Sequence, residues 1–294
     1  MGPGWGGLNG GGVRAFLEAH GLAARRDLGQ HFLQDEHMAE KLVRIAAVES
    51  GDRVIEIGTG LGIMTRALAA RAARVITVEV DAGIVRALRS EGVLPSNVAL
   101  IHGDALELDL ERLVGELPGP VRVVGNLPYA FASPLLRRLL DLSGRLESWS
   151  VMVQKEVAGR LLAAPGGREY GSLTILHQLV VAVKFGLDLH PRCFYPVPRV
   201  TSTFLHITPR SEVSVAPGEL RMVEGVVRAA FAHRRKTIVN SLRTAAAGSP
   251  LAAEKIAEIL AQHGIDRRAR AQSLSPDQWL PIARELARAG ERAG

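Results

Sequence analysis

The stretch Arg53-Val-Ile-Glu-Ile-Gly-Thr-Gly-Leu-Gly62 decides how the fold of this 294-residue chain is interpreted. Residues 53–57 are rich in β-branched side chains and predict a buried strand. Three glycines follow at positions 58, 60 and 62, and residues 63–71 have helical spacing. Glycines between a strand and a helix let the backbone turn sharply and approach a ligand closely. The stretch therefore predicts a strand, a ligand-binding loop and a helix in that order.

The spacing of these glycines argues against a dinucleotide cofactor. The dinucleotide fingerprint is G-x-G-x-x-G, whereas position 63 is Ile and the third glycine stands at position 62. A nicotinamide oxidoreductase is therefore a weak alternative, which tight binding of NAD would revive.

Further strands and helices alternate on the carboxyl-terminal side of the glycine loop. The runs 74–78, 98–102, 121–125 and 149–154 predict strands, and the runs 82–90 and 133–142 have helical spacing. This alternation predicts a mainly parallel sheet covered on both faces. Two more β-rich runs, 179–189 and 200–207, lie too close together for a helical crossover, so we expect an antiparallel pair. The pattern resembles the Rossmann-like α/β fold of class I methyltransferases.

The two ends of the chain differ from this α/β region. Gly occupies seven of the first twelve positions, so we expect residues 1–12 to be a disordered tail. Residues 13–208 form the expected catalytic domain, and residues 209–294 the expected helical domain, with helical periodicity in 219–247, 252–263 and 276–289. Residues 221–294 contain 13 Lys and Arg but only 7 Asp and Glu, which accounts for the whole net charge of +6. A basic section on a neutral body suggests a polyanionic partner, although a solvated helical face would look the same.

Two acidic residues at strand ends are candidates for binding a cofactor. Glu79 lies 21 residues after Gly58, where an acid is placed to accept hydrogen bonds from ribose hydroxyls. Asp104 follows the next strand, and its carboxylate could bind the exocyclic amine of an adenine ring. We interpret Asp81 instead as the N-cap of the helix that begins at Ala82.

The sequence Asn126-Leu127-Pro128-Tyr129 follows the fourth strand and suggests chemistry on an amino group. The Asn126 side-chain oxygen and the Leu127 carbonyl could accept hydrogen bonds from an adenine N6 amine and expose its lone pair. Pro128 restricts its own φ and holds Leu127 in extended geometry, while the Tyr129 ring could stack on the base. No strong base is needed, so orientation and electrostatics would carry the catalysis. The alternative is an ordinary turn, since Asn and Pro are common turn residues.

Several further motifs, taken in order, resemble one family, the small-subunit (16S) ribosomal RNA adenine N6,N6-dimethyltransferases. The resemblance covers the chain from Leu28 onward and rests on these segments: LGQHFLQD (28–35), QKEV with Arg160-Leu161 (154–161), YGSL (170–173), FYPVPRVTS (194–202) and FAHRRKT (231–237).

The resemblance implies a cofactor, a target and a set of site residues. It implies that S-adenosyl-L-methionine donates methyl groups to two adjacent adenines in a loop near the 3′ end of the small-subunit rRNA, in the pre-30S subunit. It places His31, Leu33, Gly58, Gly60, Glu79, Asp104 and Asn126 at the cofactor, and Phe194 with Tyr129 at the target base. We expect Lys155, Arg160, Arg234, Arg235 and Lys236 to contact RNA, with the last three on a helix.

The chain departs from the family pattern at two places. His31 stands where the family has Asn, which puts its contribution to cofactor binding in doubt. Ala130 and Phe131 replace the Asn and Ile of the usual N-L-P-Y-N-I-S/T, which would alter the shape of the target pocket rather than the chemistry.

Two rival functions remain open at this stage. One is methylation of a large-subunit rRNA adenine of the antibiotic-resistance type, and the other is a ribosome-assembly factor that has lost catalysis. We expect no metal site, because no Cys/His cluster has zinc spacing, and no membrane span. With Cys193 as the single cysteine, a reducing cytoplasmic setting is expected, and the protein is expected to be a monomer.

Overall fold

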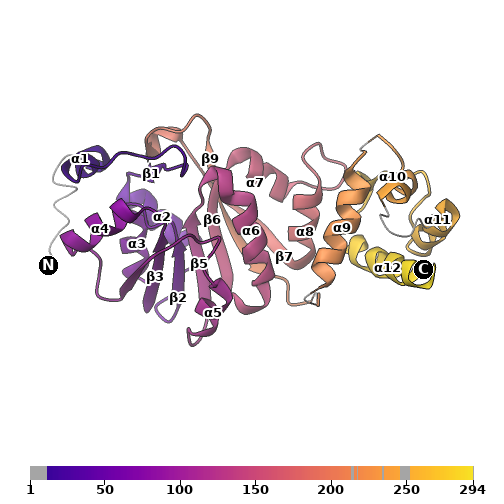
Figure 1. The fold of residues 1–294 in the computed structure, drawn as a ribbon, viewed down its shortest axis with the longest axis horizontal. Coiled ribbons are helices and arrows are strands. Elements are labelled where there is room, and N and C mark those ends of the chain that lie inside the picture. Colours follow the sequence, from indigo (N-terminus) through magenta and orange to yellow (C-terminus); the bar gives the residue numbers. More distant parts are fainter. Residues whose placement is uncertain (1–11, 213–214, 217, 234, 246–251, 294) are drawn as a thin grey trace. The chain divides into compact units, whose positions relative to one another are not determined.

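The computed structural model describes residues 12–293, except 213–214, 217, 234 and 246–251. Of the tail expected at residues 1–12, all but Gly12 lie outside the described residues, and Gly12 begins helix α1 (Gly12–Ala19). The chain divides into two compact units (Figure 1). Unit 1 contains residues up to Ala158 together with Lys184–Pro209, and unit 2 contains Gly159–Val183 and Arg210–Gly294. The boundaries expected from the sequence, 13–208 and 209–294, differ from this grouping in residues 159–183 and at Pro209.

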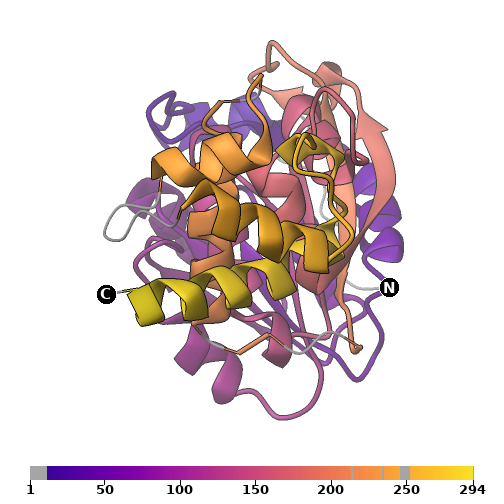
Figure 2. The same cartoon turned by 90° about the vertical axis from the view of Figure 1, so that its right-hand side faces the viewer.

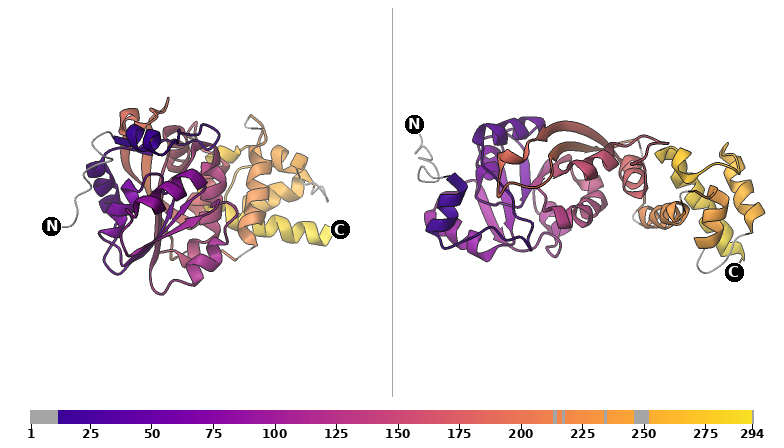
Figure 3. Two further views of the ribbon diagram at one scale, coloured as in Figure 1. Left: turned by 60° about the vertical axis from the view of Figure 1, so that its left-hand side comes forward. Right: turned by 90° about the horizontal axis from the view of Figure 1, so that it is seen from above.

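A seven-stranded sheet with the order β4-β3-β2-β5-β6-β9-β7 organises unit 1 (Figures 1 and 3). Neighbours among its first five strands pair in parallel, as the alternation in the sequence predicts. These strands are β2 (Arg53–Ile57), β3 (Arg74–Glu79), β4 (Val98–His102), β5 (Val121–Asn126) and β6 (Ser148–Gln154). Because parallel strands end at the same edge, the segments after Ile57, Glu79, His102 and Asn126 meet there.

The last strand of the chain, β9 (Ser202–Pro209), runs antiparallel to β6. It lies between β6 and β7 (Val181–Leu189), so the last two β-rich runs are neighbours in the sheet. The first strand begins two residues later than predicted, since Leu179 and Val180 still belong to helix α8 (Ser172–Val180), and the second both begins and ends two residues later. The mostly parallel sheet with an antiparallel last strand is therefore confirmed.

One face of the sheet is covered by the helices that precede and follow its first strands. Alternate strand residues, such as Val54, Val75 and Val124, share a core with buried side chains of α1, α2, α3 and α4. Alternation sends successive side chains of a strand to opposite faces, so these residues define a single apolar face. The helices of unit 1 are α1, α2 (Glu36–Ile45), α3 (Ile63–Ala69), α4 (Ala82–Glu91), α5 (Leu110–Gly115), α6 (Ala132–Asp141) and the start of α7 (Lys155–Leu162).

A second, two-stranded sheet joins segments that are far apart in the sequence. Phe32 and Leu33 form β1, which pairs antiparallel with β8 (Phe194–Tyr195). Two of the motifs that carried the family resemblance, 28–35 and 194–202, are thereby brought together. The sequence offered no signal for this pairing.

Unit 2 is helical in the part of the chain described, apart from the start of β7. It contains α8, α9 (Glu219–Phe231), α10 (Ile238–Ala245), α11 (Ala253–Gln262) and α12 (Trp279–Ala293), of which Figure 2 shows α9 to α12 toward the viewer. The helical run expected over 219–247 is two helices, because the chain turns between Phe231 and Ile238. The core includes Tyr170, Phe231 and Trp279, whose neighbouring ring centroids lie 6.3 and 6.0 Å apart. The Tyr170 hydroxyl also donates to the Leu274 carbonyl, which ties residues 159–183 to this unit. No described helix is long and apolar enough to cross a membrane.

Candidate functional site

A pocket in unit 1 lies where strands β2 to β5 end, and the glycine loop forms part of its lining. Gly58 and Gly60 have φ of 86° and 52°, a backbone conformation that side chains disfavour. A Cβ at Gly60 would also come within 3.1 Å of the Phe32 ring. The loop therefore requires glycine for its conformation, as the sequence suggested.

Glu79 holds the glycine loop at the end of β3. One carboxylate oxygen accepts the Gly60 backbone N–H at 2.8 Å, and the other accepts the Asp81 N–H at 3.0 Å. The side chain is buried, and this burial raises the pKa of Glu79. A carboxylate oxygen can accept more than one hydrogen bond, so Glu79 can bind ribose hydroxyls while it orders the loop.

A second carboxyl group, Glu56 on β2, lies fully buried beneath the loop. Thr65 and Thr77 donate their hydroxyl protons to the same Glu56 oxygen, each at 2.6 Å. Because the Thr77 hydroxyl already donates its one proton to Glu56, it accepts from Thr59, whose hydroxyl lies 2.6 Å from Thr77 Oγ1. Burial raises the pKa of Glu56 to about 8. This network fixes Thr59, the residue between the first two glycines.

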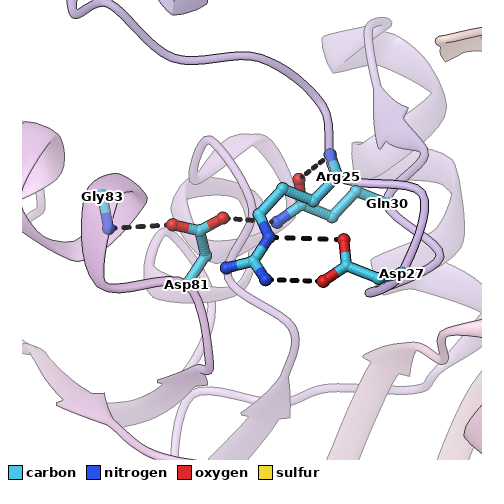
Figure 4. A network of polar contacts seen from close by, with 5 residues as sticks. All are labelled: Arg25, Asp27, Gln30, Asp81 and Gly83. Carbon is cyan, nitrogen blue, oxygen red and sulfur yellow. Dashed lines mark hydrogen bonds and ion pairs between the residues drawn. The ribbon is translucent and has the colours of Figure 1, made fainter.

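Asp81 caps helix α4, as predicted, and also holds the segment that precedes β1. Its Oδ1 accepts the backbone N–H groups of Gly83 and Ile84, and its Oδ2 accepts the Gln30 amide at 3.0 Å. The Gln30 oxygen in turn accepts the Arg25 N–H, beside the Arg25–Asp27 ion pair (Figure 4). Residues 25–31 are thus fastened to the helix next to Glu79, and residues 28–32 line the pocket.

Asp104 follows strand β4 in the chain and lines the pocket. Its Oδ1 accepts the Leu106 N–H at 2.8 Å, which fixes the carboxylate within a tight turn. The side chain is half-buried and lines the pocket. It is placed to accept a hydrogen bond from a bound ligand.

Asn126 ends strand β5 with its side-chain amide in a defined orientation. Its Nδ2 donates to the His31 carbonyl at 2.9 Å, and only the nitrogen end of an amide can do so. The Oδ1 atom is therefore the acceptor end that Asn126 offers the pocket it lines. The next residue, Leu127, donates its N–H to the Met152 carbonyl, and Pro128 has φ of −57°, so the loop is rigid at this point.

Tyr129 and His31 lie side by side at this pocket. Their rings stack with centroids 5.4 Å apart, and the Tyr129 hydroxyl shares a 2.7 Å hydrogen bond with Ser202. His31 Nδ1 lies 2.6 Å from the Pro196 carbonyl, which can only accept, so this nitrogen carries a proton. Partial burial raises the pKa of Tyr129, which keeps its hydroxyl protonated at neutral pH.

Two predicted site residues lie elsewhere. Leu33 and Phe194 are paired with each other in the β1–β8 sheet, with side chains 7% and 0% exposed, and neither lines the pocket. A ring that stacks on a base must have an accessible face, and Phe194 has none. In this structure the Phe194 ring belongs to the core, and its expected place at the target base stays a prediction.

The four described basic residues expected to bind RNA, Lys155, Arg160, Arg235 and Lys236, do not line the pocket. Lys155 begins α7 and pairs with Asp188 at 2.7 Å, and Arg160 is half-buried in the last turn of that helix. Arg234 lies outside the described residues. Arg235 and Lys236 are exposed in the turn between α9 and α10 rather than on a helix, which corrects the sequence-based expectation.

The pocket brings together most of the candidate cofactor and target residues and adds others. The predicted residues that line it are His31, Gly58, Gly60, Glu79, Asp104, Asn126, Leu127, Pro128 and Tyr129. The additional ones include Gln30, Val80, Phe131 and Leu135. Gln30 lies in the 28–35 motif that supports the family resemblance, and Phe131 is a departure from the family pattern, whereas Val80 and Leu135 have no signal in the sequence.

Comparison with known proteins gives consistent matches over most of the chain. The family model described as Ribosomal RNA adenine dimethylase matches residues 21–288. A protein of Magnetococcus marinus named Ribosomal RNA small subunit methyltransferase A is 38% identical over 92% of this chain and 95% of its own. A protein of the same name from Moorella thermoacetica is 40% identical over 92% and 96%.

Solved structures resemble the chain over a similar extent. A dimethyladenosine transferase from Plasmodium falciparum superposes with a TM-score of 0.75 at 23% identity, covering 88% of this chain and 98% of its own. The 23S rRNA methyltransferase ErmE superposes with a TM-score of 0.65 at 26% identity, covering 87% and 99%. The architecture is thus that of the rRNA methyltransferases.

Proposed function

The chain belongs to the ribosomal RNA adenine dimethylase family, and on this premise we propose that it transfers methyl groups from S-adenosylmethionine to the N6 amine of adenines in small-subunit rRNA. The observation that carries the proposal is the orientation of Asn126. Its amide nitrogen is held by the His31 carbonyl, so its oxygen is presented as a hydrogen-bond acceptor at the pocket. An adenine N6 amine is a ligand with hydrogens to donate to such an acceptor.

The residues of the pocket fit S-adenosylmethionine as the methyl donor. Glu79 offers carboxylate oxygens to ribose hydroxyls, and Asp104 offers them to the exocyclic amine of the adenine ring. The Gly58 and Gly60 backbone would border the methionine end, where a Cβ would obstruct close approach. When bound, the cofactor supplies an electrophilic methyl group on a sulfonium.

The chain's own contribution is to hold and polarise the target amine. Asn126 Oδ1 and the Leu127 carbonyl accept its two hydrogens, which favours a pyramidal nitrogen with its lone pair directed out of the ring. Pro128 and the Leu127–Met152 hydrogen bond keep that carbonyl fixed, so little reorganisation accompanies the reaction. The nitrogen becomes acidic as it is alkylated, so no strong base is required.

Tyr129 would stack on the target adenine. Its ring is already supported by His31 on one side, and its hydroxyl is fixed by Ser202, so it is a preorganised surface for a flipped base. A loop of single-stranded RNA can present such a base without the cost of opening a duplex. Phe194 is not needed for this arrangement.

Small-subunit rRNA is the preferred substrate because the curated relatives at 38–40% identity carry that name, whereas the large-subunit enzyme ErmE is 26% identical. We further propose two adjacent adenines near the 3′ end, each methylated twice, within the pre-30S subunit. The domain assignment is part of the proposal: the α/β part catalyses and the basic helical part binds RNA. The enzyme would act in the cytoplasm as a monomer. Light scattering of the purified protein would test the monomeric state.

Mass spectrometry of rRNA tests the proposal directly. Unmethylated small and large ribosomal subunits are incubated separately with the protein and labelled S-adenosylmethionine, and the nucleosides are analysed. We expect N6,N6-dimethyladenosine in small-subunit rRNA alone. Label in large-subunit rRNA would favour the resistance-type activity, and cofactor binding without transfer to either subunit would favour an assembly factor.

A further inference from the structure

We propose that Phe131 forms an aromatic wall of the cofactor pocket and stacks on the adenine ring of S-adenosylmethionine. This inference rests on the proposed function, since it assigns a residue to the same cofactor. It concerns a position at which this chain differs from the family pattern, where Ile is usual.

Phe131 is unusual in the described part of the chain because it is a large apolar side chain that is both exposed and in the pocket. Its side chain is 37% exposed, and among the exposed large apolar residues only Val80, at 40%, also lines the pocket. When a planar apolar ligand covers exposed apolar surface in a pocket, the burial of that surface stabilises the complex. The two residues come from different elements, Val80 from the end of β3 and Phe131 from the turn before α6.

Phe131 directly precedes α6, of which it is the N-cap residue. Within α6, Leu135 and Arg138 lie three positions apart, so they share one face of the helix. Leu135 lines the same pocket. Arg138 donates to the carbonyls of Ala105 and Leu108, both at 2.6 Å. This face of α6 is therefore docked against residues 104–108, the segment that begins with Asp104.

This location separates Phe131 from the target-base side of the pocket. Tyr129, two residues earlier, is turned toward His31 and Ser202, where the proposed target base would stack. Phe131 precedes the helix whose Arg138 donates to the carbonyls of Ala105 and Leu108, next to Asp104, whose carboxylate is suited to the edge of an adenine ring. A ring whose edge is bound by Asp104 presents its faces to apolar side chains, and Phe131 and Val80 are those available.

An aromatic side chain at this position has a specific consequence. A phenyl ring can stack in parallel on adenine, which an isoleucine cannot do, and such base–aromatic stacking stabilises nucleic-acid complexes. Phe131 should therefore tighten binding of the cofactor and of its demethylated product alike.

Isothermal titration calorimetry with S-adenosylhomocysteine tests the inference without any methyl transfer. We expect Phe131→Ala to weaken binding about tenfold. The affinity of Phe131→Ile should lie between those of Phe131→Ala and the native protein. Phe185→Ala is the matched control, because Phe185 is 57% exposed on β7 and does not line the pocket, and its affinity should be unchanged. Circular dichroism of each variant establishes that the fold persists.

Each outcome has a distinct meaning. If Phe131→Ala and Phe131→Ile bind S-adenosylhomocysteine as tightly as the native protein, the inference is wrong. If the affinity is unchanged but the KM for RNA rises, Phe131 faces the target base and the assignment to the cofactor is overturned. If the native protein itself does not bind S-adenosylhomocysteine, the proposed function fails, and with it the premise of the inference.

Discussion

At the scale of single residues, the side-chain amide of Asn126 donates to the His31 carbonyl, which leaves its oxygen as a hydrogen-bond acceptor. We expect Asn126→Ala to lower the rate of methyl transfer by at least about a hundredfold, because removal of one preorganised polar group at a reacting centre typically has that effect. RNA affinity should remain within a few-fold of native. Single-turnover assays with labelled cofactor and filter binding of RNA measure the two quantities. A variant with near-native turnover would remove Asn126 from the mechanism.

Glu79 combines two tasks at the same scale, since it orders the glycine loop and is the proposed ribose ligand. Glu79→Ala removes the acceptor of two backbone N–H groups as well as any bond to the cofactor. We expect calorimetry with S-adenosylhomocysteine to show at least about tenfold weaker binding, given about 1.5–3 kcal/mol for each hydrogen bond to a charged group. Glu79→Gln, which keeps one carbonyl acceptor, should bind with intermediate affinity. Equal affinity of Glu79→Ala and native protein would contradict the assignment.

At the scale of elements, β2, the glycine loop and α3 are joined by the buried carboxyl of Glu56. Its pKa is raised from 4.5 to about 8 by burial, so the folded state retains a proton that the unfolded chain releases. The unfolded state then binds fewer protons between about pH 4.5 and 8, and the contribution of Glu56 to stability falls as the pH rises through that window.

The variant Glu56→Gln isolates this contribution because glutamine cannot ionise. The free energy of unfolding of the variant minus that of the native protein should increase by more than about 1 kcal/mol from pH 5 to pH 9. Urea denaturation at both pH values measures the difference. Glu40→Gln is a matched control, since Glu40 is exposed and pairs only loosely with Arg44. A parallel pH dependence in both variants would show that Glu56 does not titrate as described.

At the scale of the whole molecule, the excess of positive charge in residues 221–294 governs how the protein should respond to salt. Phosphate contacts release counterions, so the affinity for RNA should fall linearly with salt on a logarithmic plot. We expect the double variant Arg235→Ala/Lys236→Ala to reduce that slope by about 1–2, since each phosphate contact contributes roughly one. Lys255→Ala, whose ammonium pairs with Glu258, should leave the slope nearly unchanged. An unaltered slope in the double variant would exclude the turn between α9 and α10 from the RNA interface.

Much of the molecule follows from local patterns in its sequence. The five parallel strands, the Asp81 cap and the need for glycine at positions 58 and 60 were predictable, because side-chain period, capping and backbone conformation are local properties. The positions of Glu79, Asp104 and Asn126 at one edge also followed, since parallel strands carry their carboxyl ends to the same side.

What the tertiary structure decided depends on contacts between distant segments. The β1–β8 pairing joins residues 32–33 to residues 194–195 and buries Phe194, which the family resemblance had placed at the target base. The break between α9 and α10, the orientation of the Asn126 amide and the exposure of Phe131 likewise have no local signal. A sequence pattern states which side chains are apolar or polar, but only the packing of separate elements determines which of them remain accessible to a ligand.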